Sequence, residues 1–327
     1  MRTVSILLVF TMWRPVPGAE RKASPDSEVR PVLWKAPADI RRRDLIYGAG
    51  GREHAPRPPF RFEKEDLDGT SPKYNVIDAA GVKWKVKLGL EARPETAASR
   101  LVWAAGYFTA EDYYLPDLQV SGVPAKLHRG GQFVDGDGTM HGARLKRRPG
   151  GAEKTGTWSW KCNPFLGSRE FNGLRTLMAL INNWDVKDVN NAVFRLNGDL
   201  VYEVSDLGAS FGAPGNAYPT RLSKGNLGQY RQASFFCGVG STEVNFCAPA
   251  RPSLFRLVDL PQFVRRMRLR WIGDDIPRAD AHWLGIQLSR LSSRQIRDAF
   301  RSAGYDPETA EAFASVVEHR IGELSEL

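Results

Sequence analysis

The hydrophobic periodicity of this sequence changes part-way along the chain, and that change limits its possible folds more than any other feature. From Phe60 to about residue 147, several segments alternate polar and apolar residues, which is typical of half-buried strands. After residue 168, apolar residues recur three and four apart, which is typical of amphipathic helices. This order predicts an α+β fold with a small strand-rich N-terminal lobe and a larger helical C-terminal lobe.

Individual segments refine this prediction. KYNVIDAAGVKWKVKLG predicts two strands joined by a turn at residues 79–81, and the second strand places lysines 83, 85 and 87 on one face. A helix beginning at Pro94 follows, and DYYLPDLQVSG and MHGARLKRR predict further strands. We expect residues 149–157 to form a connector.

In the second part, SREFNGLRTLMALINNW predicts an amphipathic helix, and LVYEVSDLGASFG predicts a strand that ends at Asp206. Ser292 with Gln295 predicts a capping box, and Asp306 followed by Pro307 predicts the start of the last helix. Trp158 and Trp160 are expected to pack where the two lobes join.

The N-terminus has the pattern of a secretory signal peptide. Arg2 precedes an apolar run over residues 4–13, which is too short to span a membrane. We expect residues 1–19 to be the signal peptide, 20–59 a basic irregular lead-in, 60–150 the N-terminal lobe and 151–327 the helical lobe. The expected location is secreted or periplasmic, or cytoplasmic if the N-terminus is not a signal peptide. No later stretch is apolar enough to predict a transmembrane span.

Charge and cysteine content leave several functions open. The net charge of +9 favours polyanionic partners but does not choose among nucleic acid, anionic lipid and phosphorylated ligands. FVRRMRLRW, residues 263–271, fits a helix face better than a nucleic-acid surface, so there is no strong nucleic-acid signal. Cys237 and Cys247 are candidates for a disulfide, which leaves Cys162 unpaired. DGDGT, residues 135–139, departs from the EF-hand pattern and predicts a hairpin turn.

Two segments of the strand-rich part suggest phosphate binding. GTSPK, residues 69–73, is a loop whose small residues allow backbone N–H groups to approach phosphate, although a plain turn also explains it. Lys87 ends the lysine-bearing strand, where its charge can neutralise phosphate, whereas a solvated face explains Lys83 and Lys85. The candidate residues in the loop are Gly69, Thr70, Ser71 and Lys73.

Glu95 lies on the apolar side of the predicted helix. A buried carboxylate without a cation costs several kcal/mol or more, so Glu95 needs a positive partner. Lys87 is the natural partner, and Glu91, which precedes the helix, is the weaker candidate to pair with Lys87. A first-turn glutamate favoured by the helix dipole is the simpler explanation of Glu95 taken alone.

The segment INNWDVKDVNNAVF concentrates oxygen-bearing side chains after the predicted helix. Asp185 precedes Asn190 by five residues, and Asp206 follows a strand sixteen residues after Asn190. Carboxylate and amide oxygens without Cys or His favour Mg²⁺ or Mn²⁺ over zinc. An asparagine-rich turn is the alternative. We expect loop architecture from Asp188 and Asn191, and helix capping from Asn182 and Asn183.

In this order and spacing the motifs resemble the HipA-like branch of the protein-kinase-like superfamily, which is related to the phosphatidylinositol 3/4-kinases. GTSPKYNV resembles its phosphate loop, VKLG its nucleotide-binding lysine strand, and PETAASRLVWAAGY its glutamate-bearing helix. INNWDVKDVNN resembles its catalytic loop and VSDLG its second metal aspartate. The resemblance covers about residues 69–212, and the chain also resembles a family of apparently exported bacterial proteins.

The resemblance implies a phosphotransferase that uses ATP with Mg²⁺ or Mn²⁺. Lys87 and Glu95 would hold phosphates, Asp185 would act as catalytic base, and Asn190 and Asp206 would bind the metal. Val186 and Lys187 stand where the family often has arginine and histidine, and Lys187 would supply positive charge. The acceptor would be an unidentified protein, lipid or small molecule. The alternatives are an exported pseudokinase that binds a nucleotide, metal or partner without catalysis, and a binder of divalent metal or anionic glycan.

Overall fold

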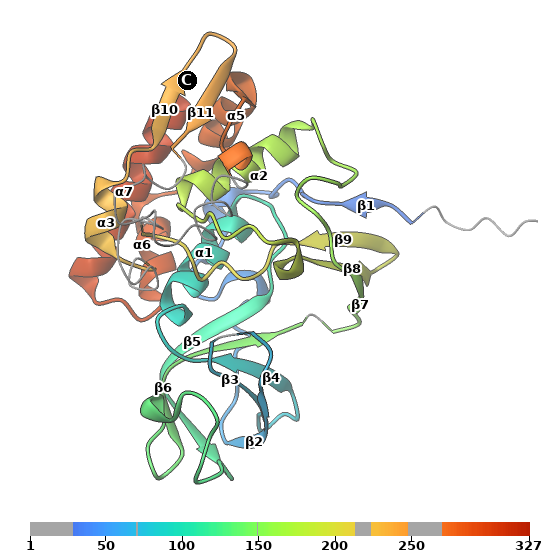
Figure 1. Cartoon of the computed structure of the whole chain (residues 1–327), viewed down its shortest axis with the longest axis vertical. Coiled ribbons are helices and arrows are strands. Elements are labelled where there is room, and N and C mark those ends of the chain that lie inside the picture. Colours follow the sequence, from blue (N-terminus) through green and yellow to red (C-terminus); the bar gives the residue numbers. More distant parts are fainter. Residues whose placement is uncertain (1–28, 70, 149, 213–223, 248–269) are drawn as a thin grey trace, which may run out of the picture.

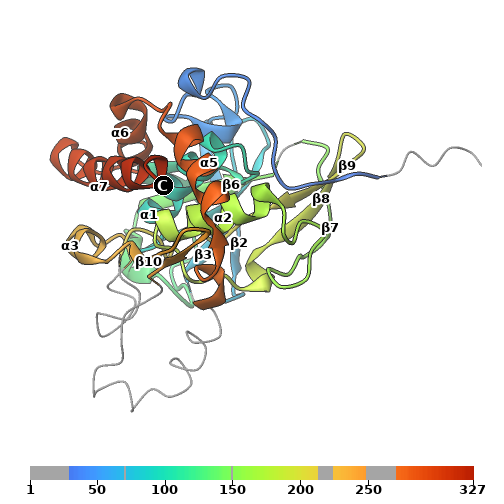
Figure 2. The same ribbon diagram turned by 90° about the horizontal axis from the view of Figure 1, so that it is seen from above.

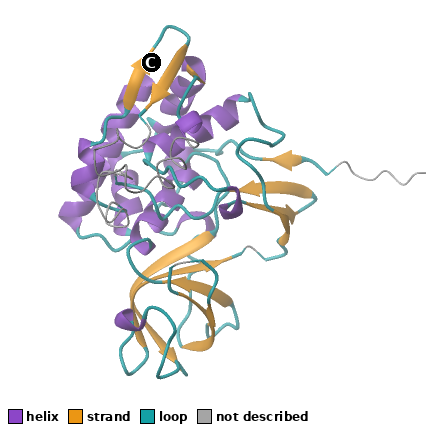
Figure 3. Cartoon of the chain, viewed as in Figure 1, coloured by secondary structure: helices purple, strands orange, loops and turns teal. Residues whose placement is uncertain are grey.

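A computed structural model describes residues 29–69, 71–148, 150–212, 224–247 and 270–327 of the chain. Figures 1 and 3 show one group of strands gathered at one end of the molecule, and the helices, with the remaining strands beside them, toward the other. The predicted α+β fold, with a strand-rich N-terminal lobe and a larger helical lobe, is confirmed. No helix in the described ranges is long and apolar enough to cross a membrane.

The strand-rich lobe is a closed five-stranded barrel in the order β2-β3-β4-β6-β5. Its interior is filled by alternate apolar residues of each strand, including Tyr74, Val76, Trp84, Val86 and Leu145. The turn predicted at residues 79–81 is confirmed, and Gly81 has a positive φ of 76° there. The strands are β2 (Phe60–Asp66), β3 (Lys73–Ile77), β4 (Lys83–Lys87), β5 (Glu111–Ser121) and β6 (Thr139–Arg147).

Helix α1 (Ala92–Ala104) connects the two lobes. It begins two residues before the predicted Pro94. It contacts β5 and β6 of the barrel and also helix α6. Its residues Ala97, Leu101 and Val102 belong to the large core of the helical lobe, so one face of α1 is shared with that lobe.

Five further helices lie in the described part of the helical lobe, and Figures 1 and 2 show α6 and α7 together on one side of it. Ser168 caps the helix predicted after it, the capping box of Ser292 with Gln295 is present, and Asp306 caps the last helix. The core includes the stacked pair Phe300 and Phe313. The helices are α2 (Arg169–Leu180), α3 (Leu227–Gln232), α5 (Arg278–Leu288), α6 (Ser293–Arg301) and α7 (Pro307–Ser325).

A second sheet lies beside the helices, away from α6 and α7 (Figures 1 and 2), in the order β1-β9-β8-β7. The expected connector at 149–157 is wrong in part, because β7 (Glu153–Gly156) pairs there with β8 (Ala192–Leu196). The strand β9 (Asp199–Glu203) ends three residues before Asp206 rather than at it. β1 (Pro31–Val32) pairs with β9, so the described part of the lead-in is ordered against the lobe.

Other sequence predictions have mixed outcomes. A third sheet joins β10 (Phe236–Val239), β11 (Glu243–Phe246) and β12 (Ile276–Pro277). The Cys237–Cys247 disulfide, which the sequence left open, is present and links β10 to the residue after β11. Trp158 and Trp160 are buried in the large core, as expected of packing residues. DGDGT forms a turn closed by a hydrogen bond from the Gly138 amide to the Asp135 carbonyl. Residues 263–269 of FVRRMRLRW lie outside the described residues.

Candidate functional site

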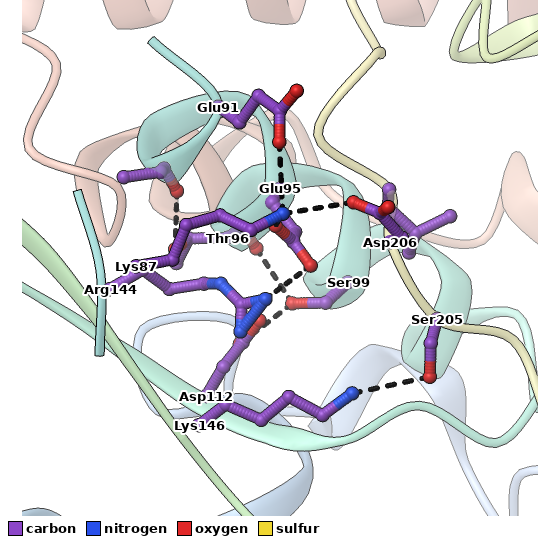
Figure 4. Close-up of polar contacts among 12 residues, drawn as sticks. Lys87, Glu91, Glu95, Thr96, Ser99, Asp112, Arg144, Lys146, Ser205 and Asp206 are labelled. Carbon is purple, nitrogen blue, oxygen red and sulfur yellow. Dashed lines mark hydrogen bonds and ion pairs between the residues drawn. The ribbon is translucent and has the colours of Figure 1, made fainter. Parts of the chain in front are cut away.

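Lys87 is the centre of a compact charge cluster between the two lobes (Figure 4). Its Nζ lies 2.9 Å from Glu91 Oε2, 2.8 Å from Glu95 Oε2 and 2.9 Å from Asp206 Oδ1. These four residues come from the end of β4, the start of α1 and the segment after β9. The contact of Lys87 with Glu95, predicted from sequence, is therefore present, and Asp206 joins the same amine.

Only one of the three lysines on this face of β4 enters the cluster, and it is the one at the end of the strand. Lys83 and Lys85 are exposed on the barrel surface, where they pair with Glu63 and Asp66. Lys87 lies where β4 leaves the barrel toward α1, and only 7% of its surface is exposed. The solvated-face interpretation is therefore correct for the first two lysines, and Lys87 is the exception.

The electrostatics of the cluster favour its charged forms. Burial opposes the charge of Lys87, but Glu95 and Asp206 outweigh burial and raise its pKa. Burial also opposes the charge of Asp206, and Lys87 outweighs burial and lowers that pKa. For Glu91, Lys87 and Lys224 overcome the effect of burial and lower the pKa to about 2. Glu91 and Asp206 are therefore anionic at neutral pH.

A second buried layer supports Glu95 from behind. Arg144 on β6 donates to Glu95 Oε1, and both side chains are buried. Arg100 and Asp112 form a neighbouring buried ion pair of 2.7 Å, and Ser99 donates to the same carboxylate. Burial raises the pKa of Asp112 despite the opposing charge of Arg100. Glu95 is thus fixed by two cations, which restricts its movement more than that of Asp206, whose side chain is 39% exposed.

The GTSPK loop lies next to this cluster. Ser71 Oγ donates to Glu91 Oε2 at 3.0 Å, and the Gly69 carbonyl accepts from Arg129. Gly69 has a positive φ of 67°, which glycine adopts without strain. Burial lowers the pKa of Lys73, which begins β3. The predicted residue Thr70 lies outside the described residues.

The predicted catalytic loop is held mainly by contacts within itself. Lys187 Nζ lies 2.7 Å from Asp185 Oδ1, and Asn190 Nδ2 donates to the Asp185 carbonyl at 3.4 Å. Among the residues that the structure describes, Lys187 is the one cation paired with Asp185. The Oδ1 atom of Asn190 accepts no hydrogen bond within the described ranges, so it is available as an oxygen ligand.

The other polar residues of the segment form its architecture, as predicted. Asn182 has a positive φ of 55° after α2, its side chain donates to Gly212, and Asn183 accepts from the Asp185 amide. Asp188 accepts from the Trp160 amide, and Asn191 donates to the Trp158 carbonyl. The Phe211 amide donates to the Ile181 carbonyl at 2.8 Å, so the chain after Asp206 runs beside the start of this loop.

Three residues of the cluster were missed or undervalued from sequence. Glu91 contacts Lys87 as closely as Glu95 does, so its rank as the weaker candidate is wrong. Arg144 sits on a predicted strand, but nothing in the sequence pairs that strand with α1. Lys224, which donates to Glu91 Oε1, is part of no periodic pattern in the sequence.

Comparisons with known proteins add little beyond the geometry. No protein-family model matches the chain, and no curated protein with a similar sequence was found. A crystal structure of the Helicobacter pylori proinflammatory kinase CtkA is similar at 10% identity with a TM-score of 0.46, covering 81% of this chain and 94% of that one. A crystal structure of the Golgi casein kinase is similar at 12% identity with a TM-score of 0.34, covering 83% of this chain and 73% of that one.

Proposed function

We propose that this protein is an ATP- and Mg²⁺-dependent phosphotransferase of kinase-like fold, of the HipA-like branch, with an unidentified protein, lipid or small-molecule acceptor. One observation carries the proposal: the Lys87 amine lies within 2.9 Å of carboxylates from α1 and from the segment after β9. A strand lysine, a helix glutamate and a distant aspartate at one point form an arrangement suited to phosphate and metal binding.

The donor set fits a hard divalent cation. Asp206 has one carboxylate oxygen on Lys87, and its partly exposed side chain leaves the other free for a ligand. Asp206 and Asn190 would hold Mg²⁺ or Mn²⁺ through oxygen atoms, which both ions prefer. When bound, such an ion neutralises negative charge on the phosphates.

The chain's own residues would supply binding and proton transfer. Lys87, oriented by Glu95, would bind phosphate oxygens, with Ser71 and Lys73 of the GTSPK loop nearby. Asp185 would orient the acceptor hydroxyl and accept its proton, and Lys187 would hold the Asp185 carboxylate in position. Catalysis would then rest on positioning and electrostatics.

A second candidate is an exported pseudokinase that binds a nucleotide, metal or partner without transferring phosphate. The observation in its favour is that the Lys87 amine already contacts three carboxylates and donates hydrogen bonds to two of them, Glu91 and Asp206, so these acids compete with a phosphate for it. Export is part of the same proposal. It is motivated by the signal-like N-terminus and supported by the Cys237–Cys247 disulfide, since disulfides are typical of oxidising compartments.

Thermal unfolding with ATP and Mg²⁺ tests these candidates. A ligand at 100 times its Kd adds about 2.7 kcal/mol to the free energy of unfolding, so wild type should show a clear rise in Tm. Asp206→Ala should lose that rise, whereas Asp117→Ala, which removes an exposed barrel carboxylate, should keep it. The absence of a rise in wild type would contradict nucleotide binding.

Phosphate transfer separates the enzyme from the pseudokinase. ADP release and autophosphorylation, measured by mass spectrometry, should occur in wild type and stop in Asp185→Ala, which should still bind ATP. Binding without transfer in wild type would favour the pseudokinase. Mass spectrometry of the N-terminus of the secreted protein would test export and the cleavage expected near residue 19.

A further inference from the structure

The position of Glu91 is not explained by its helix. Glu91 is the residue before α1, where a side chain ordinarily accepts a hydrogen bond from the first turn. Its carboxylate makes no such bond. Instead, Oε2 accepts from Ser71 Oγ at 3.0 Å and from Lys87 Nζ at 2.9 Å, and Oε1 accepts from Lys224 Nζ. The side chain is therefore directed into the site by partners outside the helix.

These partners form a donor set suited to phosphate. One hydroxyl and two ammonium groups converge on a single anionic group, and they come from the GTSPK loop, the end of β4 and the distant residue Lys224. The N-terminus of the 13-residue helix α1 adds the positive end of its dipole. Charge-assisted hydrogen bonds of this kind form to carboxylate and to phosphate oxygens.

We infer that the Glu91 carboxylate occupies the position of a phosphoryl group and competes with a nucleotide polyphosphate for Lys87, Lys224 and Ser71. Glu91 would leave these donors when the polyphosphate binds, so it lowers the affinity for that ligand. That the polyphosphate belongs to a nucleotide rests on the proposed function. That a polyphosphate binds at this position rests on the three donors themselves.

The other two carboxylates are poorer candidates for displacement. Glu95 is buried and is also held by Arg144. Asp206 shares only Lys87 among the three donors and is the proposed metal ligand. The partners of Glu91 other than Lys87 are a hydroxyl and an ammonium, which a phosphate would satisfy in its place.

Gly208 supplies an independent structural condition for this arrangement. A Cβ atom at position 208 would lie 2.7 Å from Glu91 Cβ and 3.2 Å from Glu91 Oε2. Any side chain there would push Glu91 away from its donors. The backbone of Gly208 is outside the positive-φ region, so alanine is tolerated by the backbone itself.

The test compares Glu91→Gln with wild type by isothermal titration calorimetry, using metal-free tripolyphosphate and, separately, ATP with Mg²⁺. Glutamine keeps the side-chain shape and removes the competing charge, so both probes should bind at least about tenfold more tightly. Glu311→Gln makes the same charge change on the exposed surface of α7 and should leave both affinities unchanged.

The outcomes separate this inference from the proposed function. Unchanged or weaker binding of both probes in Glu91→Gln, with ATP still bound by wild type, overturns the inference and leaves the function standing. If Glu91→Gln binds tripolyphosphate more tightly than wild type does, but neither protein binds ATP, the result supports the anion site and contradicts the nucleotide function. A loss of MgATP affinity in Glu91→Gln assigns Glu91 to the metal and overturns the inference. If wild type and Glu91→Gln bind neither probe, both proposals are overturned. If Glu91→Gln does not fold, Gly208→Ala should show the same tighter binding, and unchanged binding there overturns the inference.

Discussion

Lys87 and Lys187 both pair with carboxylates of the candidate site, but their surroundings differ. The Lys87 side chain is 9% exposed and contacts acids from two separate segments, Glu91 and Glu95 at the start of α1 and Asp206 after β9. Lys187 is 40% exposed and pairs with Asp185, two residues away. Removing Lys87 therefore alters long-range contacts between the lobes, whereas removing Lys187 alters one local contact.

This difference separates stability from function within one site. A buried cation among carboxylates contributes to folding whether or not the site is active, because its removal leaves unpaired buried charges. A partly exposed pair within one loop contributes little to folding, so any effect of changing it reports on chemistry. Variants of the Lys87 cluster therefore change stability in an enzyme and in a pseudokinase alike, whereas variants of the Asp185 loop test catalysis more directly.

The largest effect is expected for Lys87→Met. Three carboxylates whose oxygens lie within 4.8 Å of one another would lose their shared cation. We expect a loss of about 3–5 kcal/mol in the free energy of unfolding at pH 7, measured by urea denaturation. Mg²⁺ should restore part of this stability in the variant, because a divalent cation replaces the missing charge.

Lys85→Met is the matched control for that variant. It removes a lysine from the same strand, but Lys85 is exposed and pairs with Asp66 at the surface. The free energy of unfolding should fall by less than about 1 kcal/mol in this variant. Equal costs for the two variants would show that the Lys87 cluster is as solvated as the barrel surface, and the comparison between the two regions would fail.

An intermediate effect is expected from acid. Lys87 and Lys224 outweigh burial and lower the pKa of Glu91 from 4.5 to about 2 in the folded protein. A depressed folded pKa adds stability above about pH 4.5, and this stability is lost as the pH falls toward 2. The contribution at neutral pH is about 3 kcal/mol by linkage.

Urea denaturation of wild type and Glu91→Gln between pH 7 and pH 2.5 measures the contribution of Glu91 to the free energy of unfolding. Wild type should lose more stability than the variant over the acid range, because glutamine does not titrate. Parallel curves for the two proteins would show that Glu91 is not held by cations in solution. Glu311→Gln, with its exposed carboxylate, should follow wild type.

The part of the cluster that was predicted depends on repeating patterns. Glu95 lies on the apolar side of an amphipathic helix, so burial required a cation, and the alternation of β4 offered Lys87. Asp206 was found through the order and spacing of the motifs. These signals arise from regular elements, in which the position of a side chain follows from its sequence number.

The remaining contacts lie where the chain has no period. Glu91 precedes a helix and Lys224 is part of no periodic pattern, so sequence patterns do not fix the directions of their side chains. Arg144 is in a correctly predicted strand, yet its contact with Glu95 requires knowing that β6 passes α1. The short strands β1 and β7 were missed because their pairing partners, β9 and β8, lie far along the chain.

The smallest effect on stability, and the clearest on function, is expected for Lys187→Met. The pair with Asp185 is partly exposed and local, so the free energy of unfolding should change by less than about 1 kcal/mol. The rise in Tm with ATP and Mg²⁺ should persist, because the variant leaves Lys87 and Asp206 intact. Phosphate transfer should fall by at least about tenfold, because Asp185 would lose the cation that positions it for proton transfer. Transfer at the wild-type rate would remove Lys187 from the mechanism, and a large loss of stability would show that the loop is coupled to the buried cluster.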